Sequence, residues 1–272
     1  MGRRAGGAAR PGDGRRGAVR RGVDRGAGGA AAGGEGAVAG LPPGADFFPT
    51  PPWATRALTA HVLPRAGWSG RLGIVREPCA GLRHMADVLA ESGTVFPSDA
   101  HAIPCEAEIG DVQIADFLRG SLFPPADWVV TNPPFRLAEA MAHRALGLAT
   151  CGVALLLRLQ WLEGVGRWRD LFCKTPPTLV APFTERVPMC EGGWDPDLSS
   201  ATAYAWFVWM RGDPLHGGAL IGPRGCQPGD LDLFLIPPCR AALTRADDRA
   251  RFAGRHPPGW ISPTERKRRG MA

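Results

Sequence analysis

The stretch Asp127-Trp128-Val129-Val130-Thr131-Asn132-Pro133-Pro134-Phe135 is an apolar run that stops at an asparagine, two prolines and an aromatic ring. Its valines favour a buried strand, and the prolines continue neither a sheet ladder nor a helix, so the backbone leaves the sheet there. Open parallel sheets bind ligands at this carboxyl edge. The Asn132 side-chain oxygen and the Pro133 carbonyl can accept hydrogen bonds from an exocyclic NH2 group, and Phe135 offers a stacking face. The stretch predicts a site for a planar amine. The alternative is a plain turn after a strand.

A strand, a small-residue turn and a helix precede this stretch. Leu72 to Val75 reads as the strand, Glu77 to Gly81 as the turn, and Arg83 to Glu91 as the helix. Small residues let the backbone approach a ligand at a helix N-terminus. A second strand ends at Asp99, a carboxylate at the spacing that suits ribose hydroxyls, although an ordinary strand-end turn would look the same. These features predict a unit that cradles a nucleotide.

Asn132-Pro133-Pro134-Phe135 resembles the catalytic motif of class I S-adenosylmethionine-dependent amino-methyltransferases, notably the adenine-N6 DNA enzymes. The wider pattern is similar to the short phage and prophage members, over about residues 46 to 210. The resemblance implies that Asn132 and the Pro133 carbonyl accept the amine hydrogen bonds, that Pro134 completes the motif, and that Phe135 stacks on a flipped base. It implies S-adenosylmethionine as the cofactor.

The resemblance also implies a set of cofactor-binding residues. They are Phe48, Thr50, Glu77, Pro78, Gly81, Asp99, Asp116 and Phe117. Phe48 and Thr50 would close the methionine end of the pocket, Asp116 would meet the adenine amino group, and Phe117 would pack beside the adenine ring. Where the family usually has a further glycine, this chain has Arg83, which either crowds the cofactor or points outward from the helix start.

Helical and strand patterns alternate along the rest of the core. The expected segments are helices over Pro52 to Val62, Leu137 to Ala149 and Gln160 to Phe172, the last bent at its glycines, and strands over Val153 to Leu157, Thr178 to Phe183 and Ala203 to Trp209. With the resemblance, they predict an α/β, Rossmann-like class I methyltransferase fold: a mostly parallel seven-stranded sheet with an antiparallel late strand and helices on both faces. The last strand alternates sharply, which favours an antiparallel edge strand.

Between the late strands lies Thr184 to Thr202, a segment rich in Gly, Pro, Asp and Ser. A loop of this length is either functional or disordered. Arg186 and Trp194 are its candidate substrate contacts, with Met189 and Ser199 beside them. Surface decoration is the equally open alternative.

Composition divides the chain into three parts. Residues 1–44 are expected to be a disordered Gly/Ala/Arg-rich arm. Eight Arg in residues 1–40 oppose Asp13, Asp24 and Glu35, giving +5 of the formal +6. Such low complexity does not fold, and a start codon assigned too far upstream would produce it as well. Residues 45–212 are the predicted methyltransferase domain, and residues 213–272 a Gly/Pro/Arg-rich extension with the basic run 265–269.

Metal, membrane and secretion are not expected. The seven cysteines form no CxxC pair and no zinc spacing with histidine, and their odd number favours a reducing cytoplasm. Arg158 interrupts the richest apolar stretch, so no membrane span is expected.

The predicted function is methyl transfer from S-adenosylmethionine to an exocyclic amine, with adenine N6 of DNA as the favoured acceptor, by direct displacement without a covalent enzyme intermediate. The expected partner is therefore nucleic acid. One alternative is an amino-methyltransferase for RNA or for protein glutamine, because Asn-Pro-Pro-aromatic serves those acceptors too. Another is a non-catalytic DNA-binding or phage-regulatory module whose cofactor site is degenerate at Arg83.

Overall fold

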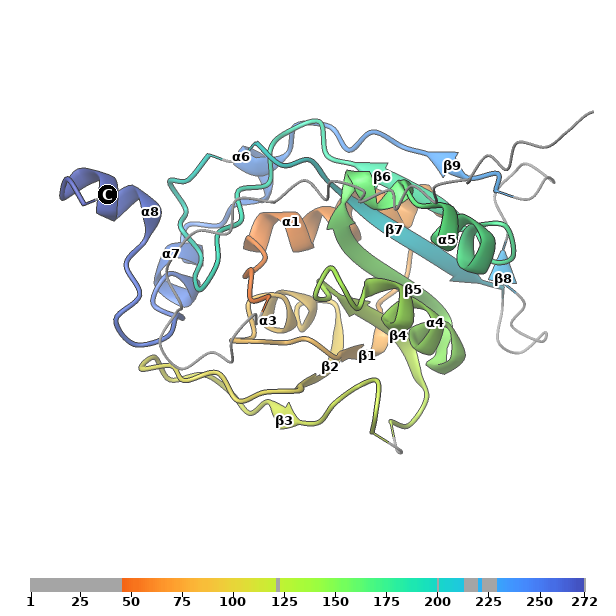
Figure 1. Cartoon of the computed structure of the whole chain (residues 1–272), viewed down its shortest axis with the longest axis horizontal. Coiled ribbons are helices and arrows are strands. Elements are labelled where there is room, and N and C mark those ends of the chain that lie inside the picture. The colour runs from red at the N-terminus through yellow and green to blue at the C-terminus, as the bar shows by residue number, and fades with distance from the viewer. Residues whose placement is uncertain (1–45, 121–122, 200, 213–219, 222–228, 272) are drawn as a thin grey trace, which may run out of the picture. The chain divides into compact units, whose positions relative to one another are not determined.

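A mixed β-sheet forms the centre of the structure, a computed structural model that describes residues 46–120, 123–199, 201–212, 220–221 and 229–271 (Figure 1). The Arg-rich arm, Cys226 and parts of the segment 213–228 lie outside the described residues. The strands are β1 Gly73–Glu77, β2 Gly93–Asp99, β3 Gln113–Ile114, β4 Ala126–Thr131, β5 Ala149–Arg158, β6 Leu179–Pro182, β7 Tyr204–Arg211, β8 Leu220–Ile221 and β9 Asp232–Leu233.

The strand order is β3-β2-β1-β4-β5-β7-β6-β9, and β8 pairs with β7. Strands β1 to β5 pair in parallel, whereas β7 runs antiparallel to both β5 and β6. This is the arrangement of the Rossmann-like class I methyltransferase fold, so the predicted fold class is confirmed. The short strands β8 and β9 extend the sheet beyond the seven strands expected.

The prediction that β7 is an edge strand is wrong. Strand β7 lies between β5 and β6 and is hydrogen-bonded on both sides. Its residues from Tyr204 to Met210 are all buried, because both faces of the sheet are covered at this place. A strand that is buried on both faces needs no polar side, and the apparent alternation reflects large and small apolar residues.

Helical segments cover the sheet. They are α1 Pro52–Ala57, which continues as a π-helix over Leu58–Val62 and as α2 Leu63–Arg65; α3 Ala86–Leu89; α4 Ala138–Leu148; a 3-10 turn over Leu159–Leu162; α5 Val165–Arg167, which continues as a π-helix over Trp168–Phe172; α6 Arg240–Leu243; α7 Asp248–Phe252; and α8 Pro263–Arg268. Helix α1 begins with Pro52, a residue whose fixed φ suits the first helical position. The expected Gln160 to Phe172 helix breaks at Gly164, where φ is 138°.

Alternate residues of β4 face opposite cores. Trp128 and Val130 join the cluster that holds α1, and Val129 joins the cluster that holds α4. The Trp206 indole nitrogen on β7 donates to the Ala54 carbonyl of α1 at 3.1 Å. These contacts fix the helices against a rigid sheet whose carboxyl edge carries the candidate site.

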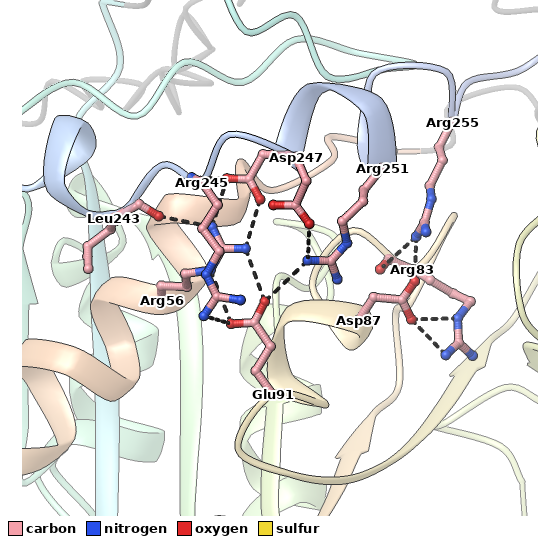
Figure 2. A network of polar contacts seen from close by, with 10 residues as sticks. Arg56, Arg83, Asp87, Glu91, Leu243, Arg245, Asp247, Arg251 and Arg255 are labelled. Atoms are coloured by element: carbon pink, nitrogen blue, oxygen red, sulfur yellow. Dashed lines mark hydrogen bonds and ion pairs between the residues drawn. The ribbon is translucent and has the colours of Figure 1, made fainter.

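The C-terminal segment 229–271 packs on the same unit of the chain. Strand β9 pairs with β6, and α7 approaches α1 and α3 through a network of charged side chains (Figure 2). The Arg56 guanidinium on α1 donates to both carboxylate oxygens of Asp248 at 2.7 and 2.8 Å and to Glu91. Arg255 donates to Asp87 at 2.6 Å, so charge pairs fasten this segment behind the turn that follows β1.

Within the described part of the chain, each helix is too short or too polar to cross a membrane. The described His, Cys, Asp and Glu residues form no cluster of three or more that could hold a metal ion. The described cysteines are free thiols.

Candidate active site

A cavity of about 430 Å³ opens at the carboxyl edge of β1, β2 and β4. This volume suits a small-molecule ligand. Nine of the predicted site residues line it: Phe48, Thr50, Glu77, Pro78, Asp99, Asp116, Phe117, Asn132 and Pro134. The fold therefore brings segments 46–50, 77–85, 99–103, 116–118 and 132–137 to one place.

Gly81 shapes one wall of the cavity without lining it. Its φ is 50°, and a Cβ at this position would lie 2.5 Å from the Phe47 ring. Its backbone N–H donates to Asp99 Oδ2 at 2.9 Å, which ties the turn after β1 to the end of β2. The glycine is therefore needed both for the backbone conformation and for the close approach of Phe47.

Arg83 has a φ of 64°, the left-handed conformation that favours glycine. Helix α3 therefore begins at Ala86 rather than at Arg83, where the sequence pattern had placed its start. The Arg83 side chain pairs with Asp87 at 2.7 Å and donates to the Asp111 carbonyl. It is not among the residues that line the cavity, so it points outward rather than crowding the site.

Glu77 ends β1 with 2% of its surface exposed, and its Oε2 has no hydrogen-bond partner among the described residues. Burial, and then the charge of Asp99, raises the pKa of Glu77 well above its ordinary value. Burial also raises the pKa of Asp99, although the backbone N–H groups of His101 and Gly81 lower it. An unpaired buried acceptor in a cavity wall needs a donor or a positive charge from a ligand.

Asp116 and Phe117 follow β3 and are held in a tight turn. Asp116 Oδ1 accepts the Leu118 N–H at 2.9 Å, and Phe117 packs edge-on against Phe123 with ring centroids 5.2 Å apart. The turn keeps both side chains in the cavity wall.

Asn132 follows the last residue of β4. Its amide nitrogen donates to the Phe48 carbonyl at 2.9 Å and to the Thr50 hydroxyl at 3.2 Å. These bonds fix the orientation of the amide, and within the described chain its Oδ1 accepts no hydrogen bond. The segment Phe48-Pro49-Thr50 thus binds the amide nitrogen of Asn132 and leaves its Oδ1 free to accept a hydrogen bond from a ligand in the cavity.

Phe135 lies beside the cavity but does not line it, and neither does Pro133. The Phe135 N–H donates to Asp46 Oδ2 at 2.8 Å, and its ring lies 6.0 Å from Phe48. The guanidinium carbon of Arg158 lies 4.0 Å from the centre of the Phe135 ring. One face of the predicted stacking platform is therefore covered by a cation.

The structure adds residues that sequence reasoning did not assign to the site. Asp46 and His84 line the cavity. Burial, and then the charge of Arg255, lowers the pKa of His84 to about 3, so its imidazole is neutral. Arg158 had a signal in the sequence, because it is a charged residue at the carboxyl end of a nearly all-apolar strand. His84 had none, because its environment comes from residues more than 150 positions away.

Arg186 and Trp194, the predicted substrate contacts of the loop 184–202, do not line the cavity. Arg186 donates to the Ala201 carbonyl, and Trp194 is buried edge-on against Phe252 of α7. The loop instead supports the cavity wall, because the Gly192 N–H donates to the Phe47 carbonyl at 2.9 Å.

The character of the lining fits S-adenosylmethionine. Glu77, Asp99 and Asp116 can accept hydrogen bonds from hydroxyl and amino groups, whereas acidic side chains offer a pyrophosphate no favourable partner. Helix α3 has only four residues, so its N-terminus offers a phosphate little dipole stabilisation. A nucleoside that carries an amino group and a sulfonium charge meets the unpaired Glu77 oxygen better than a dinucleotide does.

No protein-family model and no curated protein matches the sequence. Among solved structures, the chain is similar to a candidate RNA methyltransferase from Pyrococcus horikoshii, with 13% identity, a TM-score of 0.45, and coverage of 64% of this chain and 90% of that one. It is also similar to an S-adenosylmethionine-dependent O-methyltransferase from Thermotoga maritima (12% identity, TM-score 0.36, coverage 55% and 63%). A modification subunit of a candidate type I restriction enzyme from Vibrio vulnificus matches with 13% identity, TM-score 0.40, and coverage of 75% and 51%. These values are too low to carry an argument about activity or substrate, so the chain is described by its fold: an S-adenosylmethionine-dependent methyltransferase-like fold.

Proposed function

We propose that the protein transfers a methyl group from S-adenosylmethionine to an exocyclic amine, and that adenine N6 of DNA is the acceptor. The observation that carries the proposal is the orientation of Asn132. Its amide nitrogen is occupied by Phe48 and Thr50, which leaves Oδ1 to accept a hydrogen bond at the rim of a cavity with an unpaired buried carboxylate.

The protein residues have distinct roles in this proposal. Asn132 Oδ1 and the Pro133 carbonyl accept the amine hydrogen bonds and increase the electron density on the amine nitrogen. Glu77, Asp99 and Asp116 hold the cofactor, which when bound supplies an electrophilic methyl group on a sulfonium. Phe48 lies between the two sites, because it lines the cavity and its ring lies 6.0 Å from Phe135. The protein supplies position and polarisation rather than a nucleophile.

Two observations support an active site over a non-catalytic module. Arg83 adopts the backbone conformation of the glycine that it replaces and directs its side chain to Asp87. The cavity keeps a volume of about 430 Å³. Arg83 therefore leaves the proposed cofactor cavity open.

Cofactor binding and methyl transfer test the proposal separately. Titration calorimetry with S-adenosylmethionine measures the first, and transfer of radiolabelled methyl to DNA, RNA or a glutamine peptide measures the second. Asn132→Ala should reduce transfer about 100-fold, as loss of a polarising hydrogen bond does elsewhere, and change cofactor affinity much less. Glu77→Ala should weaken cofactor binding itself.

Gln160→Ala is the matched control, because Gln160 is an exposed amide on the turn after β5. It should leave both measurements unchanged. Absence of cofactor binding in the wild type would refute the proposal. Label in RNA or peptide alone would keep methyl transfer and replace the acceptor.

A further inference from the structure

Arg158 ends β5 at the carboxyl edge of the sheet, on the strand next to the one that leads into Asn132. Its guanidinium lies over the face of Phe135. It is half-buried and does not line the cofactor cavity. Arg158 therefore stands on the acceptor side of Asn132 rather than on the cofactor side.

Arg158 has no carboxylate partner among the residues that the structure describes. Its Nε–H is buried and donates to no group within the same residues, although the guanidinium hydrogen-bonds the Tyr204 hydroxyl. The Asp46 carboxylate accepts the Phe135 N–H and forms no ion pair with Arg158 in the described part of the chain. By contrast, Arg56 and Arg255 each pair with a carboxylate. A half-buried cation without a counter-ion is incomplete without a negatively charged ligand.

The stacked position selects the kind of anion. A guanidinium whose carbon lies 4.0 Å over the centre of an aromatic ring can leave N–H donors at its outer edge free for a ligand. This arrangement suits the oxygens of a phosphate, which Arg binds through paired hydrogen bonds. A nucleotide places a phosphate within a few bonds of its base, whereas a glutamine side chain brings no anion with its amide.

We propose that Arg158 binds a phosphate of a nucleic-acid acceptor beside the amine that Asn132 holds, and so selects nucleic acid over protein as the substrate. The proposal rests on the proposed function for the position of the amine. The phosphate contact itself is measured by binding, without methyl transfer.

Fluorescence anisotropy tests the contact with a labelled, adenine-containing oligonucleotide. The same sequence is offered as single-stranded DNA, duplex DNA, RNA, and DNA with an uncharged methylphosphonate backbone. Arg158→Gln should bind the charged oligonucleotides about tenfold more weakly than the wild type. The slope of log K against log salt should fall by about 0.7 to 0.9, the change expected for one lost phosphate contact. The comparison of DNA with RNA identifies the source of the phosphate.

Arg71→Gln is the matched control, because it removes the same charge at a distant position. Arg71 is exposed and precedes β1, at the opposite edge of the sheet from Arg158. It should bind like the wild type. Arg158→Lys keeps the charge but loses the flat donor array, so about threefold weaker binding is expected. This variant serves as the test if Arg158→Gln fails to fold, which its melting curve shows.

Wild-type affinity in both Arg158 variants would overturn the proposal. So would equal binding of the uncharged backbone, or binding of a glutamine peptide and of no oligonucleotide. Arg158-dependent binding without methyl transfer would support the phosphate site and refute the proposed function. Methyl transfer without any effect of Arg158 on binding would support the proposed function and refute the phosphate site.

Discussion

Glu77 combines deep burial with a carboxylate oxygen that has no partner among the described residues. Its raised pKa means that, at pH values between the ordinary carboxyl pKa and the raised one, the folded state binds more protons than the unfolded chain. Where the folded state binds more protons, stability falls as pH rises. This residue therefore destabilises the fold at neutral pH in order to face the cavity.

Glu77→Gln should raise the melting temperature at neutral pH, because the amide needs no ionisation. The difference from the wild type should be absent below the ordinary carboxyl pKa of 4.5 and grow as pH rises above it, up to the raised pKa of the folded state. The same variant should bind S-adenosylmethionine about tenfold more weakly. Melting curves from pH 4 to pH 8, with calorimetry at pH 8, check both; a variant less stable than the wild type at every pH contradicts this account.

Arg83 adopts the left-handed backbone conformation that favours glycine, and its side chain makes this conformation strained. Both Arg83→Gly and Arg83→Ala remove the ion pair to Asp87, so the difference between them isolates the φ of 64°. The Gly variant should be more stable than the Ala variant by about 1 kcal/mol. Urea denaturation measures it. Equal stabilities would mean that the turn relaxes when the side chain is shortened.

Helices α1 and α7 are joined by the Arg56 and Asp248 pair, both of whose side chains are nearly inaccessible to solvent. Burial raises the pKa of Asp248, but the hydrogen bonds from Arg56 and from the Arg245 backbone N–H, together with the charges of Arg56 and Arg251, hold the net pKa below the ordinary value. Arg56→Met should destabilise the fold by about 3 to 5 kcal/mol, since it leaves a buried carboxylate unpaired. In Arg56→Met with Asp248→Leu, most of the loss should be recovered. Chemical denaturation of the single and double variants checks this; additive losses would contradict it.

The strands that could be located from the sequence are those specified by a short run of neighbouring residues. The runs around Val75, Val129 and Leu156 became β1, β4 and β5, because apolar β-branched and aliphatic residues bounded by Gly and Pro specify buried strands. The prediction that α3 begins at Arg83 is wrong, because the left-handed backbone of Arg83 keeps this residue in the turn and the helix begins at Ala86. No residue pattern indicates this backbone angle. Nine of the predicted site residues also line the cavity, because the order of motifs along the chain located them.

The C-terminal segment could not be placed from sequence, since it is held by charge pairs between distant residues. Arg255 contacts the Leu82 and Arg83 carbonyls and Asp87. The hydrophobic periodicity of a sequence does not indicate such long-range polar partners. The role of Arg158 likewise depends on its distance to Phe135 in space. For this reason, residue type and spacing located residues of the cavity wall better than they located the surroundings of Phe135.

The C-terminal segment 229–271 connects to the rest of the molecule at β6, at α1 and at the turn after β1, among other places. Removal of residues 229–272 takes away β9, α7 and Arg255, and should lower the melting temperature by about 10 °C or more and abolish cofactor binding. Removal of residues 262–272 alone, which contains α8, is the control and should retain binding. Melting curves and calorimetry compare the two. Full cofactor affinity in the longer truncation would show that the segment only covers the site.

The contact of Arg255 with the turn after β1 also sets an order of events during synthesis (Figure 2). The ribosome makes the turn after β1 well before Arg255, and domains settle only when all of their parts have emerged. A nascent chain therefore carries this turn without its contact to Arg255 until that residue has left the ribosome. Ribosome-bound chains that stop before Arg255 should be unable to retain the proposed cofactor, and chains from which Arg255 has emerged should retain it.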